Sequence, residues 1–400
     1  MLILKPFRLE KENFNLDNKK HILFLCSWYP NKTDPTNGNF VQKHAEAAAL
    51  FNQVSSLSVF SDHIEENIKI DCKSENGIYN VIVYYKKVSS NIPFYSAFLK
   101  AKRYFSALYN GYNTIVTKQS KPDLIHVNVV YTIGLFALIL KYLKKIPFVV
   151  TEHWTAFLPN GYSVSRLTKF ISKIIFNQAA MVIPVSEDLK NALIKLGVKT
   201  NFEVISNVVD QTKFKIKQIN TNEIKQMLHI STAKDDHKNI SGILRVLKAL
   251  SLQRKDFKLL IVSDGNLQEH IDYASKLGIF NELVFFEDTK TTEEISELMQ
   301  QSDFLLLFSN YENFPCVIAE ALVTGLPVVS SNVNGIPEHV NSENGILVKP
   351  RDESGLQQAL NKMLNNYQNF KPESLRTYGI KHFSYEEIGK KFDAIYQSIS

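Results

Sequence analysis

Short apolar runs alternate with stretches of helical periodicity along most of this chain, and this rhythm is the feature that most limits its fold. A short apolar run followed by an amphipathic helix is typical of βαβ units, whose strands lie parallel in one sheet. The first series of predicted strands comprises His21–Cys26, Leu57–Phe60, Val81–Tyr85, Leu124–Val127, Pro147–Thr151 and Met181–Val185. The second comprises Phe202–Ile205, Met227–Ser231, Lys258–Val262, Leu283–Phe286, Phe304–Phe308 and Pro327–Ser330. The sequence therefore predicts two α/β lobes.

The length of 400 residues supports this division, because a single hydrophobic core rarely extends so far. The polar, lysine-rich stretch 207–221 has little periodicity and is the natural junction. We expect one Rossmann-like domain over residues 1–206, a second over 207–383 and a final helix over 384–400. The final helix is indicated by apolar residues at helical spacing, namely Ile388, Phe392, Ile395 and Ile399.

The composition indicates a globular protein of a reducing compartment. A hydrophobic fraction of 44% and a charged fraction of 22% are ordinary for a folded chain. The three cysteines are far apart, which favours neither a disulfide framework nor a zinc site. Charged residues break up any apolar run near the start, so a signal peptide is not expected and the predicted location is cytoplasmic; they are Lys5, Arg8, Glu10, Lys11, Glu12 and Asp17. The apolar stretch Val129–Leu140 is too short to span a bilayer and predicts a buried helix.

The positive charge is concentrated in the first lobe, where residues 76–151 contain a single acid, Asp123. Aromatic residues alternate with lysine and arginine over residues 94–112, as in helices that lie on an anionic membrane surface. The alternative is an ordinary helix that packs on the sheet and exposes a basic face. No nucleic-acid partner is expected, since no recognised binding motif accompanies the charge.

The loop that follows the predicted strand Phe304–Phe308 carries the clearest functional signal. Ligands of open α/β sheets collect beyond the carboxyl ends of the strands. Asn313 is a suitable N-cap, and a helix is expected to start there and stop at Gly325. Free N–H groups at a helix start bind phosphate, so the predicted diphosphate seat consists of Asn313, Phe314, Pro315 and Cys316.

Two glutamates extend this predicted site. Glu312 precedes the helix and is suited to accept hydrogen bonds from sugar hydroxyls. Glu320 lies further along the helix and is suited to hold the two hydroxyls of a ribose. The alternative is that both are solvated acids, although the apolar neighbours of Glu320 favour a functional position.

This region resembles glycosyltransferase family 4, whose members adopt the GT-B fold. The resemblance rests on the two glutamates, which are separated by seven residues, and on the segments that follow them: Ala321, Gly325, Pro327-Val328-Val329 and Gly335-Ile336-Pro337-Glu338. It continues in Trp28-Tyr29-Pro30, Gly38, Thr151-Glu152-His153-Trp154, Val185-Ser186, Asn207, Asp210, Phe214, Lys238-Asn239 and Asn344-Gly345-Ile346-Leu347-Val348. The resemblance implies two Rossmann-like domains that face a central cleft, the first binding the acceptor and the second the nucleotide sugar, with the last helix returning to the first domain.

The resemblance also implies roles for single residues. Gly38 would belong to a loop that closes near the donor phosphates and the acceptor. His153 would bind the transferred sugar near the reacting carbon, and Lys238 would neutralise the diphosphate. Gly335 belongs to the motif on the donor side. His126 has no such support and is expected to be structural.

The chain departs from the family pattern at several positions. Ala233 stands where many members have an arginine, and the neighbouring Lys234 is the expected substitute. Glu287, Ser263 and Asn334 each stand where a glycine is common. These departures concern the details of donor binding rather than the class of protein.

The expected reaction needs no divalent ion, because the sequence contains no Asp-x-Asp triplet to hold one. No cofactor is expected, and a UDP- or GDP-linked sugar would be the substrate. The family retains the anomeric configuration, which implies front-face displacement. For a double displacement, Glu312 is the nucleophile that the sequence offers.

The predicted function is transfer of a hexose-type sugar to a glycan or lipid-linked saccharide, in cell-surface polysaccharide or glycolipid synthesis at the inner face of the membrane. Three alternatives remain open from the residues alone. They are a nucleotide-sugar epimerase or phosphorylase, a catalytically silent subunit that binds sugar nucleotides, and a scaffold protein.

Overall fold

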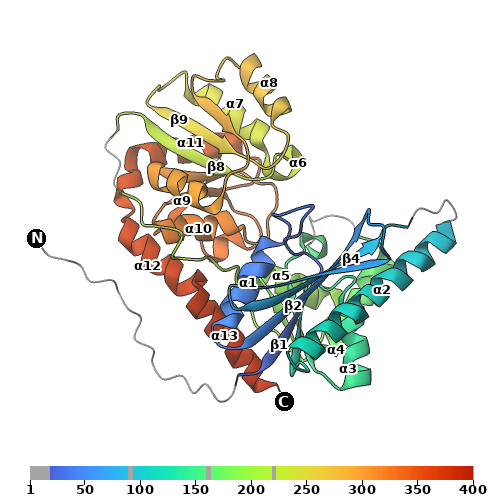
Figure 1. The fold of residues 1–400 in the computed structure, drawn as a ribbon. Coiled ribbons are helices and arrows are strands. Elements are labelled where there is room, and N and C mark those ends of the chain that lie inside the picture. Colours follow the sequence, from blue (N-terminus) through green and yellow to red (C-terminus); the bar gives the residue numbers. More distant parts are fainter. Residues whose placement is uncertain (1–18, 89–92, 159–163, 219–221, 400) are drawn as a thin grey trace, which may run out of the picture.

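The computed structural model describes residues 19–88, 93–158, 164–218 and 222–399, and these form two α/β lobes stacked end to end (Figure 1). Two domains, each built on a mainly parallel sheet, are present, as the alternation of strands and helices predicts. The charged residues expected to exclude a signal peptide lie within residues 1–18, outside the described parts. None of the described helices combines the length and the apolar character needed to cross a membrane.

The first lobe contains a seven-stranded sheet in the order β3-β4-β2-β1-β5-β6-β7. The strands of this order are β3 (Ile68–Glu75), β4 (Ile78–Lys86), β2 (Gln53–Asp62), β1 (His21–Cys26), β5 (Leu124–Asn128), β6 (Phe148–Glu152) and β7 (Met181–Pro184). Every pairing is parallel except that of β3 with β4. The fully buried strands β1, β5 and β6 are mostly apolar rather than alternating, because helices cover both of their faces.

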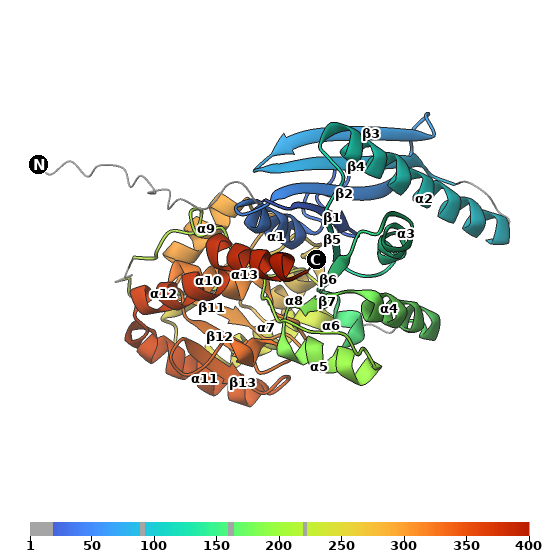
Figure 2. The ribbon, with the colours of Figure 1, turned by 90° about the horizontal axis from the view of Figure 1, so that it is seen from below.

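Helices form two layers over this sheet (Figure 2). One layer consists of α2 (Pro93–Lys118), α3 (Gly134–Lys144) and α4 (Arg166–Gln178), and the other of α1 (Asn39–Ala49) and α13 (Tyr385–Ser398). The short η2 (Thr155–Phe157) and α5 (Glu187–Leu196) follow β6 and β7. The helix expected within Val129–Leu140 begins only at Gly134, because the preceding residues form the loop after β5.

The second lobe contains a six-stranded parallel sheet in the order β10-β9-β8-β11-β12-β13. Its strands are β10 (Val284–Glu287), β9 (Phe257–Val262), β8 (Lys225–Ile230), β11 (Phe304–Leu307), β12 (Val328–Ser331) and β13 (Gly345–Val348). Its helices are α6 (Asp235–Lys238), α7 (Ile240–Leu250), α8 (Gln268–Lys276), α9 (Thr292–Gln301), α10 (Cys316–Thr324), η3 (Ile336–Glu338), α11 (Glu353–Asn366), η4 (Tyr367–Asn369) and α12 (Pro372–Phe383).

One predicted strand is wrong. Residues 202–205 form no strand and make a single bridge, between Phe202 and Val182. These residues run beside β7, the strand at one edge of the first sheet, at the point where the chain begins to leave the first lobe. Two strands were not predicted, β3 and β13, and both lie at a sheet edge.

The chain passes between the lobes twice. The first passage, from Asn207 onward, is held to the second lobe by Arg376, whose guanidinium donates to the carbonyls of Phe214 at 2.6 Å and Gln211 at 3.2 Å. The second passage is α13, which packs on α1 and shares the core of the first lobe. Residues 219–221 of the predicted junction lie outside the described parts.

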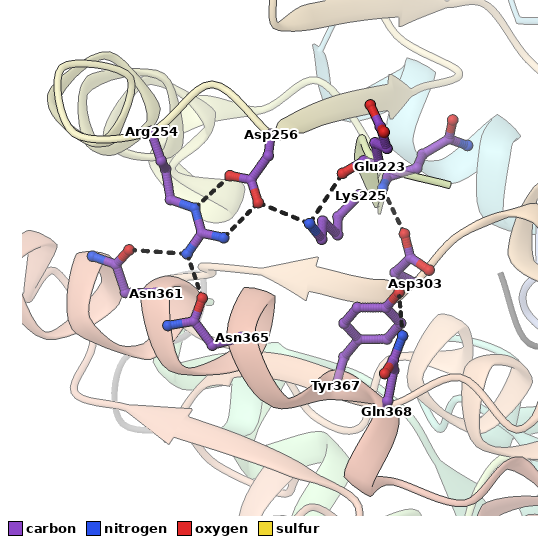
Figure 3. A network of polar contacts seen from close by, with 10 residues as sticks. Glu223, Lys225, Arg254, Asp256, Asp303, Asn361, Asn365, Tyr367 and Gln368 are labelled. Carbon is purple, nitrogen blue, oxygen red and sulfur yellow. Dashed lines mark hydrogen bonds and ion pairs between the residues drawn. The ribbon is translucent and has the colours of Figure 1, made fainter. Parts of the chain in front are cut away.

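A polar network closes the end of the second lobe that lies away from the cleft (Figure 3). Asp256, at the start of β9, accepts hydrogen bonds from Arg254 at 2.6 and 2.7 Å and from Lys225 at 2.8 Å. Arg254 also donates to Asn365 of α11 at 2.8 Å. These contacts tie the first residues of β8 and β9 to α11, and they leave the carboxyl ends of the strands free for a site.

Candidate active site

The carboxyl ends of both sheets point toward the cleft between the lobes. The strand order reverses between β1 and β5 in the first sheet, and between β8 and β11 in the second. Such reversal points open a crevice in which α/β proteins bind ligands. His153 follows β6, Lys238 follows β8, and Glu312 follows β11. The fold therefore brings these three sequence-predicted residues to one region.

Glu312 and Lys238 form a buried ion pair. Glu312 is 5% exposed, and its Oε1 accepts hydrogen bonds from Lys238 Nζ and, at 2.8 Å, from Ser309 Oγ. Burial alone would raise the pKa of the Glu312 carboxyl, but the Lys238 ammonium and His237 outweigh that effect and lower it to about 2. The site thus holds a permanent carboxylate and a cation at its centre.

His237 is a member of this cluster that the sequence did not reveal. Its ring stacks on Tyr311 with centroids 4.2 Å apart, and its Nε2 lies 3.6 Å from Glu312 Oε2. This Nε2 is buried and makes no hydrogen bond within the described chain. An imidazole nitrogen therefore faces the second oxygen of Glu312, and only the position of His237 directly before Lys238 could have suggested this.

His153 faces the cluster from the first lobe. Its Nε2 is buried without a hydrogen-bond partner among the described residues, and burial lowers the pKa of the imidazole well below 6.5. Its ring lies 4.6 Å from that of Phe40 and 5.2 Å from that of His44. The imidazole is neutral at neutral pH and is available to a ligand.

The loop that carries His153 is fixed by Glu152. The carboxylate of Glu152 accepts the N–H groups of His153 at 2.9 Å, Trp154 at 2.8 Å and Val130 at 3.0 Å. Burial raises the pKa of Glu152 to about 7, although these three donors act in the opposite direction. Because each donor belongs to the main chain, the loop geometry depends on this one side chain.

The start of α10 differs from the expectation. The helix begins at Cys316 with Pro315 as N-cap, so the prediction of Asn313 as N-cap is wrong. The side-chain amide of Asn313 instead donates to the main-chain carbonyl of His153 across the cleft. Phe314 is buried and accepts a hydrogen bond from Asn207 at 2.8 Å. The helix ends at Gly325, as predicted.

Glu320 has a partner that the sequence did not indicate. Its Oε1 lies 2.9 Å from Nζ of Lys43, a residue of α1 in the opposite lobe. The side chain of Glu320 is 14% exposed and that of Lys43 is 16% exposed. The carboxylate expected to bind a ribose is therefore held by an ion pair that crosses the cleft.

The two predicted glycines lie where a side chain would not fit. Gly38 has a φ of 64°, and a Cβ atom there would lie 2.5 Å from the carbonyl carbon of Trp28. At Gly335 a Cβ atom would lie 2.4 Å from the oxygen of Asn313 and 2.7 Å from Cβ of Ser186. Both glycines allow close backbone approach, Gly38 at the start of α1 and Gly335 between the lobes.

Lys234 does not join the buried cluster. It is exposed and lines a cavity of about 740 Å³ between the lobes. The first lobe contributes residues 34–36 to this cavity, and the second contributes Ala233, Asp264 and Thr289 among others. His126 is occupied, as expected of a structural residue, since its ring nitrogens contact Tyr396 and Thr151, each at 2.6 Å.

Glu338 and Asn334 add contacts between the lobes. The carboxylate of Glu338 accepts the N–H groups of Glu187 at 2.9 Å and Asp188 at 3.0 Å, in the first turn of α5. Asn334 donates to Asp188 at 2.9 Å and accepts the N–H of Glu312 at 3.1 Å. A side chain of one lobe thus caps a helix of the other.

Within the parts of the chain that the structure describes, no group of three or more His, Cys, Asp or Glu side chains could hold a metal ion. The polar groups of the cleft are instead a carboxylate paired with a lysine, a neutral histidine and the start of α10.

Comparison with known proteins agrees with this geometry. The family described as "Glycosyl transferases group 1" matches residues 210–382, and the one described as "Glycosyltransferase Family 4" matches residues 71–213. The N-acetyl-alpha-D-glucosaminyl L-malate synthase of Bacillus anthracis is 25% identical over 304 residues, which cover 71% of this chain and 77% of the relative.

Two solved structures share the fold. Sucrose-phosphate synthase from Thermosynechococcus elongatus superposes with a TM-score of 0.75 at 18% identity, over 95% of this chain and 99% of the other. HepE of Anabaena, in complex with UDP and glucose, superposes with a TM-score of 0.70 at 18% identity, over 95% of this chain and 100% of the other.

Two facing parallel-sheet lobes and these matches define a glycosyltransferase of the GT-B fold. The chain belongs to glycosyltransferase family 4, as its paired glutamates and the motifs after them indicate.

Proposed function

We propose that this glycosyltransferase moves a hexose-type sugar from a UDP- or GDP-linked donor to a glycan or lipid-linked saccharide, with retention of configuration and without a metal ion. The proposal places the enzyme in cell-surface polysaccharide or glycolipid synthesis. The observation that carries it is the buried pair of Glu312 and Lys238, which stands across the cleft from the free Nε2 of His153.

The donor side of the proposed site lies in the second lobe. Lys238 and the N–H groups at the start of α10 would neutralise the diphosphate, and Glu320 would hold the ribose. Lys234 would contact the phosphates from the cavity that it lines. The Anabaena structure that shares this fold contains UDP and glucose, which supports a nucleotide sugar as donor.

The reaction would begin when a hydroxyl oxygen of the acceptor bonds to the anomeric carbon of the donor sugar. The bond between that carbon and the diphosphate oxygen breaks, and its electron pair stays on the diphosphate. The hydroxyl proton passes to the same diphosphate oxygen, so attack and departure occur on one face of the sugar. Lys238 would stabilise the charge that develops on the leaving group.

Glu312 and His153 would orient the sugar. A carboxylate whose pKa is about 2 accepts hydrogen bonds from sugar hydroxyls at any working pH. The neutral imidazole of His153 can bind a hydroxyl without adding charge near the anomeric carbon. Closure of the two lobes would exclude water and limit hydrolysis of the donor.

The proposal includes contact with an anionic membrane surface through residues 94–112 of α2. Tyr95 is 54% exposed, Phe98 is 64% exposed and Tyr109 is 53% exposed. Lys100 and Lys102 are exposed on the same helix, so apolar and cationic groups occur together there. The side chain of Phe94 lies outside the described parts.

A screen of nucleotide sugars tests the function. Each UDP- or GDP-linked sugar is added to the purified chain, and thermal stabilisation and release of free nucleotide are measured with and without EDTA. A transferase gives free nucleotide plus a glycoside, whereas an epimerase gives an altered donor. The absence of both stabilisation and nucleotide release for every donor at millimolar concentration would contradict the proposal.

A further inference from the structure

A second cavity lies in the first lobe, beside the carboxyl ends of β1, β2 and β4. Its volume is about 380 Å³. Aromatic side chains dominate its wall, and one cation stands at its edge; these residues are Trp28, Tyr85, Tyr104, Phe105, Tyr131 and Lys100. No residue of the proposed donor site belongs to it.

The cavity is connected to the proposed reaction centre through Trp28. The ring of Trp28 lies 6.4 Å from that of Trp154, the residue after His153. It also lies 6.1 Å from the ring of Phe40, which in turn lies 4.6 Å from the ring of His153. Trp28 thus belongs both to the wall of this cavity and to the group of aromatic rings around His153.

The chemistry of the wall selects the kind of ligand. Flat aromatic rings pack against the apolar faces of sugar rings, and Tyr131 and Tyr104 add hydroxyl groups that can meet sugar hydroxyls. Lys100 is exposed and adds a single positive charge at the rim, which suits a phosphate. Within residues 76–151 the one acid is Asp123, so little in this part of the sequence opposes an anion.

The helix that bears Lys100 also offers an apolar surface. Phe98 precedes Ala101 and Phe105 at helical spacing, and both of these line the cavity. Phe98 is 64% exposed, so its ring extends the cavity wall outward along the surface of α2. An apolar chain attached to a bound sugar phosphate would find this ring next to it.

We propose that this cavity is the acceptor site and that the acceptor is a saccharide joined through phosphate to an apolar chain. The inference rests on the proposed transfer reaction and narrows its acceptor to an anionic, lipid-linked saccharide. The sugar packs among Trp28, Tyr104 and Tyr131, the phosphate meets Lys100, and the chain leaves past Phe98.

The tryptophans of the chain provide an intrinsic fluorescence probe for this cavity. The chain contains two tryptophans, and both of them, Trp28 and Trp154, lie at this cavity or in contact with its wall. Intrinsic tryptophan fluorescence of the full chain therefore reports binding directly, without donor and without turnover. The probes are short-chain prenyl diphosphates carrying N-acetylglucosamine or glucose, the neutral octyl glycosides of the same sugars, and inorganic diphosphate.

The expected result is a saturable fluorescence change with at least one lipid-linked sugar diphosphate. The matching octyl glycoside should bind about fivefold more weakly, as expected for loss of one partly exposed charge contact. Inorganic diphosphate can also occupy the proposed donor site, so it should give no change that Lys100→Gln removes. Equal affinity for the charged and neutral probes would overturn the assignment of the phosphate.

Variants separate the two parts of the cavity. Lys100→Gln should remove the advantage of the charged probe and leave the octyl glycoside unchanged, whereas Tyr131→Ala should weaken both probes. Both residues are exposed, so the fold should tolerate these changes. The matched controls are Lys118→Gln on the same helix and Tyr142→Ala on α3, which are exposed and lie outside the cavity.

Failure of this inference can be told from failure of the proposed function. If donors stabilise the protein in the thermal screen while no lipid-linked sugar changes the fluorescence, the acceptor site is wrong and the transferase remains. If the lipid-linked sugars bind and no donor does, the cavity is a saccharide site but the acceptor role fails with the transfer reaction.

Discussion

Lys43 Nζ lies 2.9 Å from Glu320 Oε1, so a lysine of the first lobe occupies the carboxylate that is proposed to hold the donor ribose in the second. An incoming ribose would have to exchange with this ammonium. The pair also fixes the relative position of α1 and α10, since each side chain belongs to one of these helices. The donor site and the contact between the lobes thus share one side chain.

Replacing Lys43 by methionine should tighten nucleotide binding. The variant frees Glu320 for the ribose and removes its competitor, so the Kd of UDP or GDP should fall by about three- to tenfold, whereas the free protein should melt at a lower temperature. Calorimetric titration and thermal melting check both effects. Lys213→Met, which breaks an exposed pair with Glu293, is the control. Weaker nucleotide binding in Lys43→Met would mean that Lys43 contacts the donor itself.

Changing Glu312 to glutamine should reduce the transfer rate by roughly 10²- to 10³-fold, because it removes a charge at the reacting centre and leaves Lys238 without its partner. Rates are compared with those of Glu282→Gln, an exposed control. A loss below tenfold would exclude a direct role.

The same carboxylate should influence stability in acid. The folded-state pKa of Glu312 is lowered from 4.5 to about 2, so its stabilising contribution is complete above pH 4.5 and disappears as the pH falls toward 2. The free energy of unfolding of Glu312→Gln should therefore lie below that of the parent by roughly 3 kcal/mol at pH 7. The difference should shrink between pH 4.5 and 3 in denaturant titrations, and a constant difference would contradict the pairing.

Three buried histidines should cause a second loss of stability on acidification, in a pH range above that of Glu312. Burial lowers the pKa of His44 to about 4 and the pKa values of His126 and His153 well below 6.5. The unfolded chain binds their protons first, so stability should decrease as the pH falls below 6.5. His44→Gln should reduce the slope by about 1.4 kcal/mol per pH unit, whereas the exposed His63→Gln should not change it.

Glu338→Ala should loosen the contact between the lobes. The variant removes the acceptor for two N–H groups at the start of α5, although the folding of each sheet does not depend on it. The radius of gyration from small-angle scattering should increase, and the KM for the donor should rise several-fold. Glu343→Ala, exposed on the same lobe, is the control. An unchanged scattering curve together with an unchanged KM would show that this contact does not hold the lobes.

The membrane proposal predicts co-sedimentation with anionic vesicles at low salt and little with zwitterionic ones. The double variant Phe98→Ser, Lys102→Gln should reduce the bound fraction strongly, because it removes an apolar and a cationic group from α2. Leu143→Ser with Lys144→Gln, on exposed positions of α3, is the matched control. Equal binding to both kinds of vesicle, or no binding at low salt, would refute this part.

The buried strands were the easiest elements to predict. His21–Cys26 forms β1 over the expected range because all six of its residues are buried and the run is nearly all apolar. β3 was not predicted, since its residues alternate between charged and apolar and it lies at the sheet edge. Residues 202–205 have the apolar pattern of a strand, but they make only one bridge with β7.

The site residues that could be predicted are those that belong to a recognisable local motif. Glu312 and Lys238 were identified from local motifs, and the structure pairs them. Lys43 could not be identified, because its contact with Glu320 depends on the arrangement of two lobes rather than on a pattern within one segment. Asn313 was wrongly predicted as an N-cap for a related reason. An asparagine near a helix start is a common N-cap, but the side-chain amide of Asn313 donates to a main-chain carbonyl of the other lobe.

The packing of α13 has a consequence for synthesis on the ribosome. Ile388, Phe392 and Tyr396 share a core with Ile22 and Val41, which leave the ribosome far earlier. Part of the interior of the first lobe therefore stays uncovered until residues 385–398 have emerged. The apolar face exposed during that interval is a natural target for chaperones, and the final folding of this lobe should follow the emergence of α13.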